Sequence, residues 1–376
     1  MGSYLTAEIS ASAVRSNFAL LRERIAPETK LCAVVKADGY GHGLATLLDV
    51  VAGEADWLAV ASPAEAIELR RLGCEKPLLV FFSACADADA GELRELLTEL
   101  IGGDVTLTVV APAEVAAIGE AARRLGKQAH VHVKVDTGMG RSGVLPEGAA
   151  GLVAQARAEP GVRLTGLYTH FATADGADKA FTREQLARLL EVAGSVGRRD
   201  ELTVHAANSA ATIDLPETHL DMVRPGIALY GCQPSGELHN KLPLRPALRL
   251  TARLMQRKTL PAGSRCGYGL TCRFEHDTPV GLVPAGYADG YARCLSNRAT
   301  MRIGGRDVPV RGRVSMDQVI VELTDVPGAA VGDEVEVVSN DPAAPHSVEG
   351  LARLCGTIPY EVTCRLGRRA RRVLVE

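Results

Sequence analysis

Residues 130–170 read HVHVKVDTGMGRSGVLPEGAAGLVAQARAEPGVRLTGLYTH, and this stretch indicates the fold of the chain. A run rich in β-branched residues, His130–Val135, is followed by a glycine-rich loop and by the helix-period segment Gly148–Ala158. A second strand-like run, Leu164–His170, completes the unit. A strand, a helix and a strand in this order are typical of parallel strands joined by a helical crossover.

The same alternation continues on both sides of this unit. The other strand-like runs are Leu31–Lys36, Trp57–Ala61, Pro77–Ser83, Val105–Val110, Leu202–His205 and Met222–Arg224. Helical spacing occurs in Ala64–Leu72, Gly91–Leu100, Ala113–Leu125 and Phe181–Val196, and at Val14, Phe18, Leu21 and Ile25 behind the candidate caps Ser10 and Ser12. Eight strands in about 240 residues predict a (β/α)8 barrel of the TIM type rather than a doubly wound sheet.

The pattern changes near residue 240, where helical spacing fades and short alternating runs begin. These runs are Leu248–Thr259, Val280–Pro284, Thr300–Ile303, Asp307–Val310, Val319–Leu323 and Glu334–Val338. We therefore expect an α/β chain with a (β/α)8 barrel domain over residues 1–240 and a mostly β domain over residues 241–376.

Composition excludes several classes of protein. The 376 residues are 47% apolar and 23% charged, which is the balance of a globular chain rather than a disordered or fibrous one. The net charge of -3 gives no reason to expect a nucleic-acid or membrane-surface partner. Charged residues interrupt the first 25 positions, so we expect no signal peptide. The nine cysteines form no CxxC pair, so we expect no metal site and free thiols in a reducing cytoplasm.

The strand that ends at Lys36 is the first candidate for chemistry. Burying an ammonium group is costly, and the carboxyl ends of barrel strands are where catalytic groups lie. A lysine that binds an aldehyde cofactor loses this charge. The glycines of residues 37–43 let a ligand approach the backbone, and Tyr40 can donate to a phosphate. A lysine that extends its amine to solvent at a strand end is the structural alternative.

A second candidate is the loop of residues 134–143, in which Gly138, Gly140 and Gly143 satisfy GxGxxG. We reject a dinucleotide site, because the preceding strand is the fifth in the series and carries His132 and Lys134. The alternative is a loop that directs Arg141 into the mouth of the barrel.

Polar residues end three more strands, at His170, Ser209 and Arg224. Each of them alone has an ordinary structural explanation, such as a helix cap at Ser209. Together with Lys36 and Arg141 they predict one site assembled on a single face of the barrel. Tyr268 between two glycines would by itself indicate only a hairpin.

Residues 34–43, VVKADGYGHG, resemble the lysine signature of the alanine racemases, the barrel-fold class of pyridoxal phosphate enzymes. Other segments match the same family in the same order, so the resemblance covers nearly the whole chain. These segments are Lys134–Gly143, Tyr168–Asp175, residues 207–210, Val223–Gly231, Cys266–Gly269, Gly286–Gly290, Arg313–Gln318 and Tyr360–Leu366.

The resemblance implies a role for each matching position. Lys36 would bind pyridoxal 5'-phosphate covalently, and Tyr268 would be the second base, supplied by the other subunit of a homodimer. The phosphate would be held by Tyr40, Ser209, Gly226, Ile227 and Tyr360. Arg224 would bind the pyridine nitrogen, and His170 would link Arg224 to Tyr268.

Further positions concern the substrate and the entrance. Arg141 would contact the cofactor ring oxygen and the substrate, and the Met316 N–H would bind the substrate carboxylate. Tyr287 and Arg313 would line the entrance. Lys134 stands where many members carry a carbamylated lysine that orients Arg141.

The implied function is interconversion of L-alanine and D-alanine by two bases, which supplies D-alanine for bacterial peptidoglycan in the cytoplasm. A serine/alanine racemase module is an alternative, although Tyr360 favours alanine because a smaller group would leave room for a hydroxymethyl side chain. A non-catalytic pyridoxal phosphate-binding barrel would lack the second domain and Tyr268. Related decarboxylases carry an acidic residue in place of Arg224.

Overall fold

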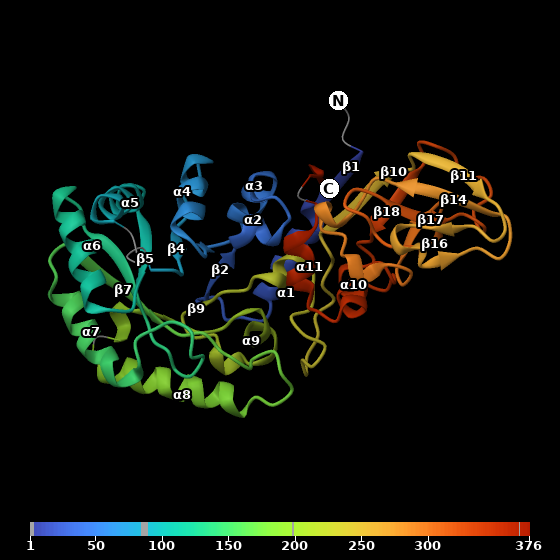
Figure 1. Cartoon of the computed structure of the whole chain (residues 1–376). Coiled ribbons are helices and arrows are strands. Elements are labelled where there is room, and N and C mark those ends of the chain that lie inside the picture. The colour runs from blue at the N-terminus through green and yellow to red at the C-terminus, as the bar shows by residue number, and fades with distance from the viewer. Residues whose placement is uncertain (1–3, 84–88, 198, 368) are drawn as a thin grey trace.

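The computed structural model describes residues 4–83, 89–197, 199–367 and 369–376. Within these ranges, eight parallel strands close a barrel, which confirms the predicted fold class (Figure 1). The barrel is closed because the last strand pairs with the first, for example at Lys30 and Met222. The barrel strands are β2 (Lys30–Val34), β3 (Trp57–Val60), β4 (Leu78–Val80), β5 (Val105–Val109), β6 (Ala129–Lys134), β7 (Val162–Tyr168), β8 (Thr203–His205) and β9 (Met222–Val223).

Helices surround the barrel and contribute buried apolar residues to its core. They are α1 (Ala11–Arg22), α3 (Leu44–Glu54), α4 (Pro63–Arg71), α5 (Ala90–Gly102), α6 (Pro112–Arg124), α7 (Pro146–Ala158), α8 (Ala180–Ser195) and α9 (Ser209–Asp214). Ser10 caps α1, as expected, by accepting the Ala13 N–H at 3.1 Å. The sequence did not indicate α3, because its run of apolar residues lacks a polar face. In the described part of the chain, none of the helices is long and apolar enough to cross a membrane.

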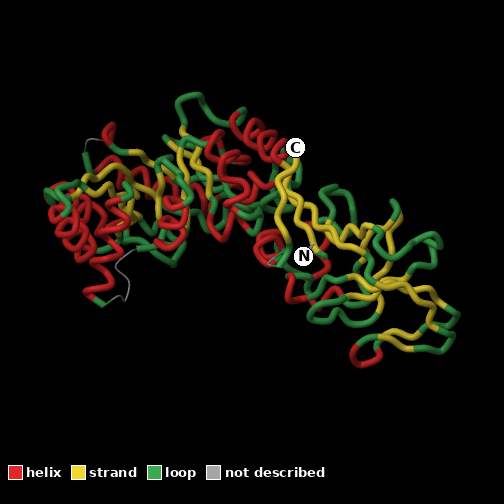
Figure 2. Tube along the Cα trace, turned by 90° about the horizontal axis from the view of Figure 1, so that it is seen from above, coloured by secondary structure: helices red, strands yellow, loops and turns green. Residues whose placement is uncertain are grey.

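The second part of the molecule is built on a nine-stranded sheet in the order β11-β14-β17-β16-β15-β18-β10-β1-β19. Its strands are β1 (Leu5–Ser10), β10 (Leu248–Arg253), β11 (Gln256–Leu260), β14 (Thr278–Val283), β15 (Thr300–Ile303), β16 (Arg306–Arg311), β17 (Val319–Glu322), β18 (Glu334–Val338) and β19 (Arg371–Val375). A separate pair joins β12 (Arg265–Cys266) to β13 (Cys272–Arg273). Figure 2 shows the helix-rich barrel and this sheet as two parts of an elongated molecule.

Three details differ from the sequence-based expectation. The predicted barrel range begins at residue 1, but β1 pairs with β10 and β19 in the other sheet, and such long-range pairing leaves no local signal. The predicted run Leu248–Thr259 is two strands, β10 and β11, which pair with different neighbours. Two short helices, α10 (Val348–Cys355) and α11 (Pro359–Arg365), lie between β18 and β19 in the predicted β domain.

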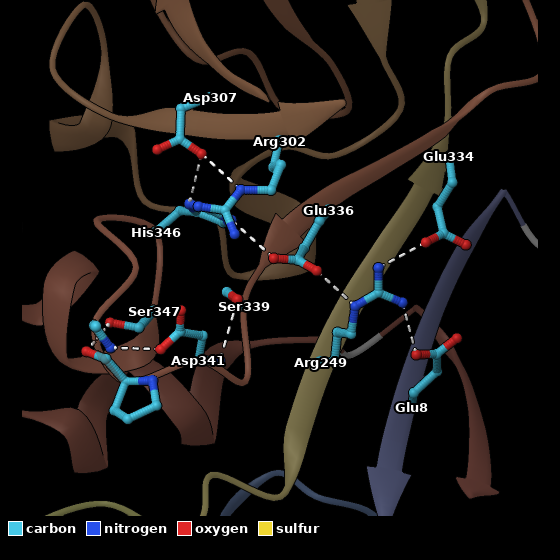
Figure 3. Close-up of polar contacts among 12 residues, drawn as sticks. Glu8, Arg249, Arg302, Asp307, Glu334, Glu336, Ser339, Asp341, His346 and Ser347 are labelled. Atoms are coloured by element: carbon cyan, nitrogen blue, oxygen red, sulfur yellow. Dashed lines mark hydrogen bonds and ion pairs between the residues drawn. The ribbon is translucent and has the colours of Figure 1, made fainter. Parts of the chain in front are cut away.

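An ion-pair cluster fastens β1 to the sheet (Figure 3). Arg249 on β10 contacts Glu8 at 3.0 Å, Glu334 at 2.6 Å and Glu336 at 2.7 Å. Glu336 also contacts Nε2 of the buried His346 at 3.0 Å. One guanidinium therefore joins β1, β10 and β18, so the first strand of the chain is bound to the C-terminal part by charge as well as by backbone pairing.

Candidate active site

A cavity of about 360 Å³ opens at the carboxyl ends of the barrel strands. Its walls come from several strands and from α11, which is the arrangement expected of a site in this fold. The lining residues are Val34, Lys36, Tyr40, Ala61, Phe81, Phe82, Lys134, Arg141, Ser142, Tyr168, His170, Asn208, Ser209, Arg224, Gly226 and Tyr360. Nine residues predicted for the site from the sequence are among them.

β2 ends at Val34, two residues before Lys36, so the predicted strand Leu31–Lys36 extends two residues too far. The Lys36 side chain is half-buried in the cavity wall. Burial and the nearby Arg141 lower the pKa of the Lys36 amine, while Glu65 opposes this change. A larger fraction of the amine is therefore neutral near pH 7 than in an ordinary lysine, and a neutral amine can act as a nucleophile or a base.

The backbone after Lys36 forms a left-handed turn. Ala37, Asp38, Gly39 and Tyr40 have φ values of 53°, 55°, 62° and 53°. Left-handed backbone costs roughly 1–2 kcal/mol for each residue that carries a side chain, so three of these four residues are strained. The turn brings Lys36 and Tyr40, four positions apart, into the same cavity wall.

A small polar cradle lies opposite this turn. The hydroxyl of Ser209 accepts the Gly226 N–H at 2.8 Å and the Ala228 N–H at 3.4 Å. A side chain at Gly226 would collide with Tyr40, because its Cβ would lie 2.3 Å from the Tyr40 hydroxyl. Tyr360 from α11 packs beside Tyr40 with 6.0 Å between ring centroids. Ile227 follows Gly226 and is fully buried behind the cradle.

Arg224 is buried in the wall of the cavity and is held by hydrogen bonds. It donates to Nδ1 of His205 at 2.7 Å and to the carbonyls of Thr169 at 2.8 Å and Ala206 at 3.0 Å. Burial lowers the pKa of Arg224 to about 10, so the guanidinium stays protonated at neutral pH. Since arginine only donates, His205 accepts at Nδ1 and carries its own proton on Nε2.

The hydrogen-bond chain continues from His205 to His132 at 3.0 Å, and the Tyr168 ring stacks on His205 with 4.7 Å between centroids. The sequence did not predict that these residues are buried partners of Arg224. The signal available was alternating polar residues within a barrel strand at His132 and Lys134. The described contacts include no hydrogen bond between Arg224 and His170, so the link through His170 stays a prediction.

Three histidines with lowered pKa values, the buried His42 and His132 and the half-buried His170, make stability depend on pH. Burial, with nearby arginines, lowers the pKa of His132 and His170 to about 3, and burial lowers that of His42 to about 4. In the unfolded chain these groups titrate near 6.5, so below that pH the unfolded state binds more protons. The free energy of unfolding is therefore expected to fall on going from pH 7 to 5.5, on the order of 1 kcal/mol per histidine.

Chemical denaturation at the two pH values measures this effect. His132→Gln is expected to reduce the loss of unfolding free energy between them. The control His276→Gln changes an exposed histidine and is expected to leave the loss unchanged. Equal losses in the wild type and His132→Gln would contradict the conclusion that the lowered pKa of His132 contributes to the pH dependence.

The glycine-rich loop after β6 is organised by one carboxylate. Asp136 accepts the N–H groups of Gly138, Gly140 and Arg141, each at 3.0 Å. The loop directs Arg141 to the cavity, as predicted. Lys134 lies beside it, and burial together with Arg141 and Arg224 lowers the pKa of Lys134 to about 8. The described residues contain no group of acidic, histidine and cysteine side chains that could hold a metal ion.

The other predicted site residues lie elsewhere, on the surface of the C-terminal part. Tyr268 is 71% exposed, and Tyr287, Arg313 and Met316 are also exposed. Gly269 beside Tyr268 packs against the Arg313 guanidinium, and Met316 accepts the Ala288 N–H at 3.0 Å. These four residues come from three neighbouring segments, around residues 268, 287 and 313–316, and form one exposed patch. Within one copy of the chain, none of them lines the cavity.

Comparison with known proteins places this geometry in a family. The family description "Alanine racemase, N-terminal domain" matches residues 9–234, and "Alanine racemase, C-terminal domain" matches residues 247–374. The chain is 41% identical over 374 residues to an alanine racemase of Desulfovibrio desulfuricans, covering 98% of both chains.

Solved structures agree with the sequence relatives. An alanine racemase of Clostridium difficile superposes with a TM-score of 0.92 at 34% identity, covering 100% of this chain and 97% of that one. An alanine racemase of Streptomyces lavendulae superposes with a TM-score of 0.90 at 37% identity, covering 100% and 98%. The match extends through both parts of the molecule, and this chain belongs to the alanine racemase family.

Proposed function

We propose that the protein interconverts L-alanine and D-alanine with pyridoxal 5'-phosphate as its cofactor. The observation that carries the proposal is the cavity at the strand ends, which combines the Lys36 amine, the Arg224 guanidinium and the Ser209–Gly226 cradle. This cavity brings together an amine of lowered pKa and a buried cation.

The residues present fit this cofactor. Lys36 would hold it covalently, and the backbone around Ser209, Gly226 and Ile227, with the hydroxyls of Tyr40 and Tyr360, would bind its phosphate. Because residue 226 is a glycine, the Tyr40 hydroxyl can lie close to its backbone. A Cβ at this position would occupy the place of the hydroxyl. When bound, the cofactor supplies a ring that delocalises negative charge from the substrate Cα.

The protein supplies the proton transfers and the charge around them. Lys36 can take or return the Cα proton on one face of the substrate, because its lowered pKa favours the neutral amine. Arg224 would donate a hydrogen bond to the ring nitrogen of the cofactor and would keep its proton, because a guanidinium does not readily give one up. A ring nitrogen left without a proton is a weaker electron sink, which disfavours side reactions such as transamination.

Tyr268 requires a second copy of the chain in this proposal. Its exposed position outside the cavity supports donation of its hydroxyl to the site of a partner subunit in a homodimer. Tyr287, Arg313 and Met316 would accompany it and form the entrance. The Met316 N–H has no acceptor among the described contacts, so it is available for a substrate carboxylate. Residues 241–376 thus provide the second base in this proposal.

Lys134 is a candidate for carbamylation. At a pKa of about 8, more of its amine is neutral and can add carbon dioxide with release of a proton. The resulting anion would be balanced by Arg141 and Arg224, the cations that lower the pKa of the unmodified lysine.

We also propose that the D-alanine product serves bacterial cell-wall peptidoglycan and that the enzyme works in the cytoplasm. The cysteines of the described residues are free thiols, which supports a reducing compartment. Cys85 lies outside the described residues.

The test is interconversion of each enantiomer of alanine and of serine by the purified protein with added cofactor. Faster turnover of alanine supports the proposal, and Tyr360 in the cavity wall is the residue expected to disfavour the hydroxymethyl side chain. Faster turnover of serine would identify a serine racemase. Cofactor binding without interconversion of either amino acid would identify a non-catalytic binding protein.

A further inference from the structure

We propose that Glu65 is a positioning residue that holds the left-handed turn after Lys36, so that Lys36 and Tyr40 are presented together to the cavity. The chemical role of Lys36 rests on the proposed function, whereas the positioning itself is a property of the folded chain and can be tested without catalysis.

Glu65 lies in the first turn of α4, and its two carboxylate oxygens have different partners. One oxygen accepts the Ala37 N–H at 2.7 Å. The other accepts the N–H groups of Ala61 and Ser62, both at 2.9 Å, which caps the start of α4. A single side chain therefore joins the end of β2 to the corner between β3 and α4.

The turn needs an external clamp because its own backbone is strained. Ala37 is exposed, so no packing of its methyl group compensates for its left-handed conformation. The Ala37 N–H is the first amide of the left-handed segment, and its recorded acceptor is the Glu65 carboxylate. Loss of this bond would leave the strained residue next to Lys36 without its tether.

A second clamp acts at the far side of the turn. Asp38 accepts the Leu44 N–H at 2.7 Å and contacts Arg372 of β19 at 3.2 Å. Arg372 also donates to the Gly41 carbonyl at 3.3 Å. The Lys36 end of the turn relies on Glu65, and the far end relies on Asp38 and Arg372.

The chain contains a matched comparison at Glu114 in α6. One Glu114 oxygen accepts the N–H groups of Val110 at 2.6 Å and Ala111 at 3.3 Å, as Glu65 does for its own helix. The other oxygen accepts the Ser83 hydroxyl at 2.6 Å instead of an amide of the lysine turn. The two glutamates share the capping role, and only Glu65 contacts the turn.

Glu65→Gln isolates the bond to the turn. The one remaining amide oxygen can keep the two capping bonds, which places the NH2 group against the Ala37 N–H, where two donors face each other. Glu114→Gln makes the same chemical change, but its NH2 group faces a hydroxyl, which can also accept. Both variants lose one charge and keep a helix cap.

Hydrogen exchange of the cofactor-free proteins is the direct measurement. In Glu65→Gln, the amides of residues 37–43 are expected to exchange at least about tenfold faster than in the wild type, the change for one hydrogen bond to a charged acceptor. In Glu114→Gln they are expected to be unchanged. Equal exchange in all three proteins, or equal acceleration in both variants, would overturn the proposal.

The reactivity of Lys36 gives a second readout. Glu65 opposes the lowering of the Lys36 pKa, so its neutralisation is expected to move the labelling of Lys36 by an amine reagent to lower pH. Glu114→Gln is expected to leave the labelling profile at its wild-type position. A labelling profile unmoved in Glu65→Gln would show that this carboxylate does not act on the amine.

A rescue separates positioning from general destabilisation. Glycine adopts a left-handed conformation without strain, so Ala37→Gly in the Glu65→Gln background is expected to recover much of the slow exchange. No recovery in the double variant would mean that strain at Ala37 is not what Glu65 opposes. A wild-type protein that fails to racemise alanine refutes the proposed function and leaves the exchange and labelling results to decide on Glu65.

Discussion

Replacement of Lys36 by alanine is expected to abolish the cofactor absorbance and the racemase activity together, with a loss of at least about 10³-fold in rate. The reason is that one amine performs two tasks, covalent attachment and proton transfer on one face of the substrate. No neighbouring side chain can replace it at the same place, because Lys134 belongs to another strand and is surrounded by Arg141 and Arg224.

Borohydride reduction of the cofactor-loaded wild type followed by peptide mass analysis measures the attachment directly. The modification is expected on the peptide that contains Lys36. Lys30→Ala is the matched control, because Lys30 is an exposed lysine at the start of the same strand, and it is expected to keep both the absorbance and the activity. A fully active Lys36→Ala protein would refute the assignment of Lys36 as the residue that attaches the cofactor and transfers the proton.

Replacement of Tyr268 by alanine is expected to leave the cofactor bound and to slow racemisation by about 10²–10⁴-fold. Racemisation falls in both directions, because the two enantiomers have equal free energies. Exchange of the Cα hydrogen with deuterated solvent is expected to survive only for the enantiomer whose proton Lys36 removes. Tyr268→Phe is expected to keep the cofactor and to lose racemisation as Tyr268→Ala does. Tyr4→Phe, at another exposed tyrosine, is expected to have no effect on the rate.

Mixing the two inactive variants tests whether Tyr268 acts across a subunit interface. A mixed dimer of Lys36→Ala and Tyr268→Ala would contain one site with neither substitution. After exchange of subunits, about a quarter of the wild-type activity is expected, because half of the dimers are mixed and each has one intact site of two. Mixtures that stay inactive, or a fully active monomer, would contradict the shared site.

Most of the barrel could be predicted from the sequence because its signals are local. Strand runs such as Leu164–His170 and the helix caps lie within short windows, and α4 and α6 begin within two residues of the predicted positions. The end of β2 was misplaced because the apolar pattern continues to Val35, while the backbone has already left the strand. Hydrophobic periodicity reports burial, and it does not report the sign of φ.

The site was predictable where one residue type at a strand end carries the chemistry, as at Lys36, Arg141 and Arg224. His205 and His132 were not recognised, because a buried imidazole is defined by its hydrogen-bond partner. The partner of His205 is Arg224, 19 residues further along the chain, and the partner of His132 is His205, 73 residues away. The supporting carboxylate of Glu65 was hidden for the same reason, since its local pattern is that of an ordinary helix cap.

The sequence by itself determined the order of the elements and the residue types available at each strand end, because both depend on short-range periodicity and on side-chain chemistry. Only the tertiary structure decided that β1 joins the far sheet, that Glu65 and Arg372 clamp the strained turn, and that Tyr268 lies away from Lys36 within one chain. These features depend on which distant segments meet, and that is settled by the packing of the whole chain rather than by any local stretch of it.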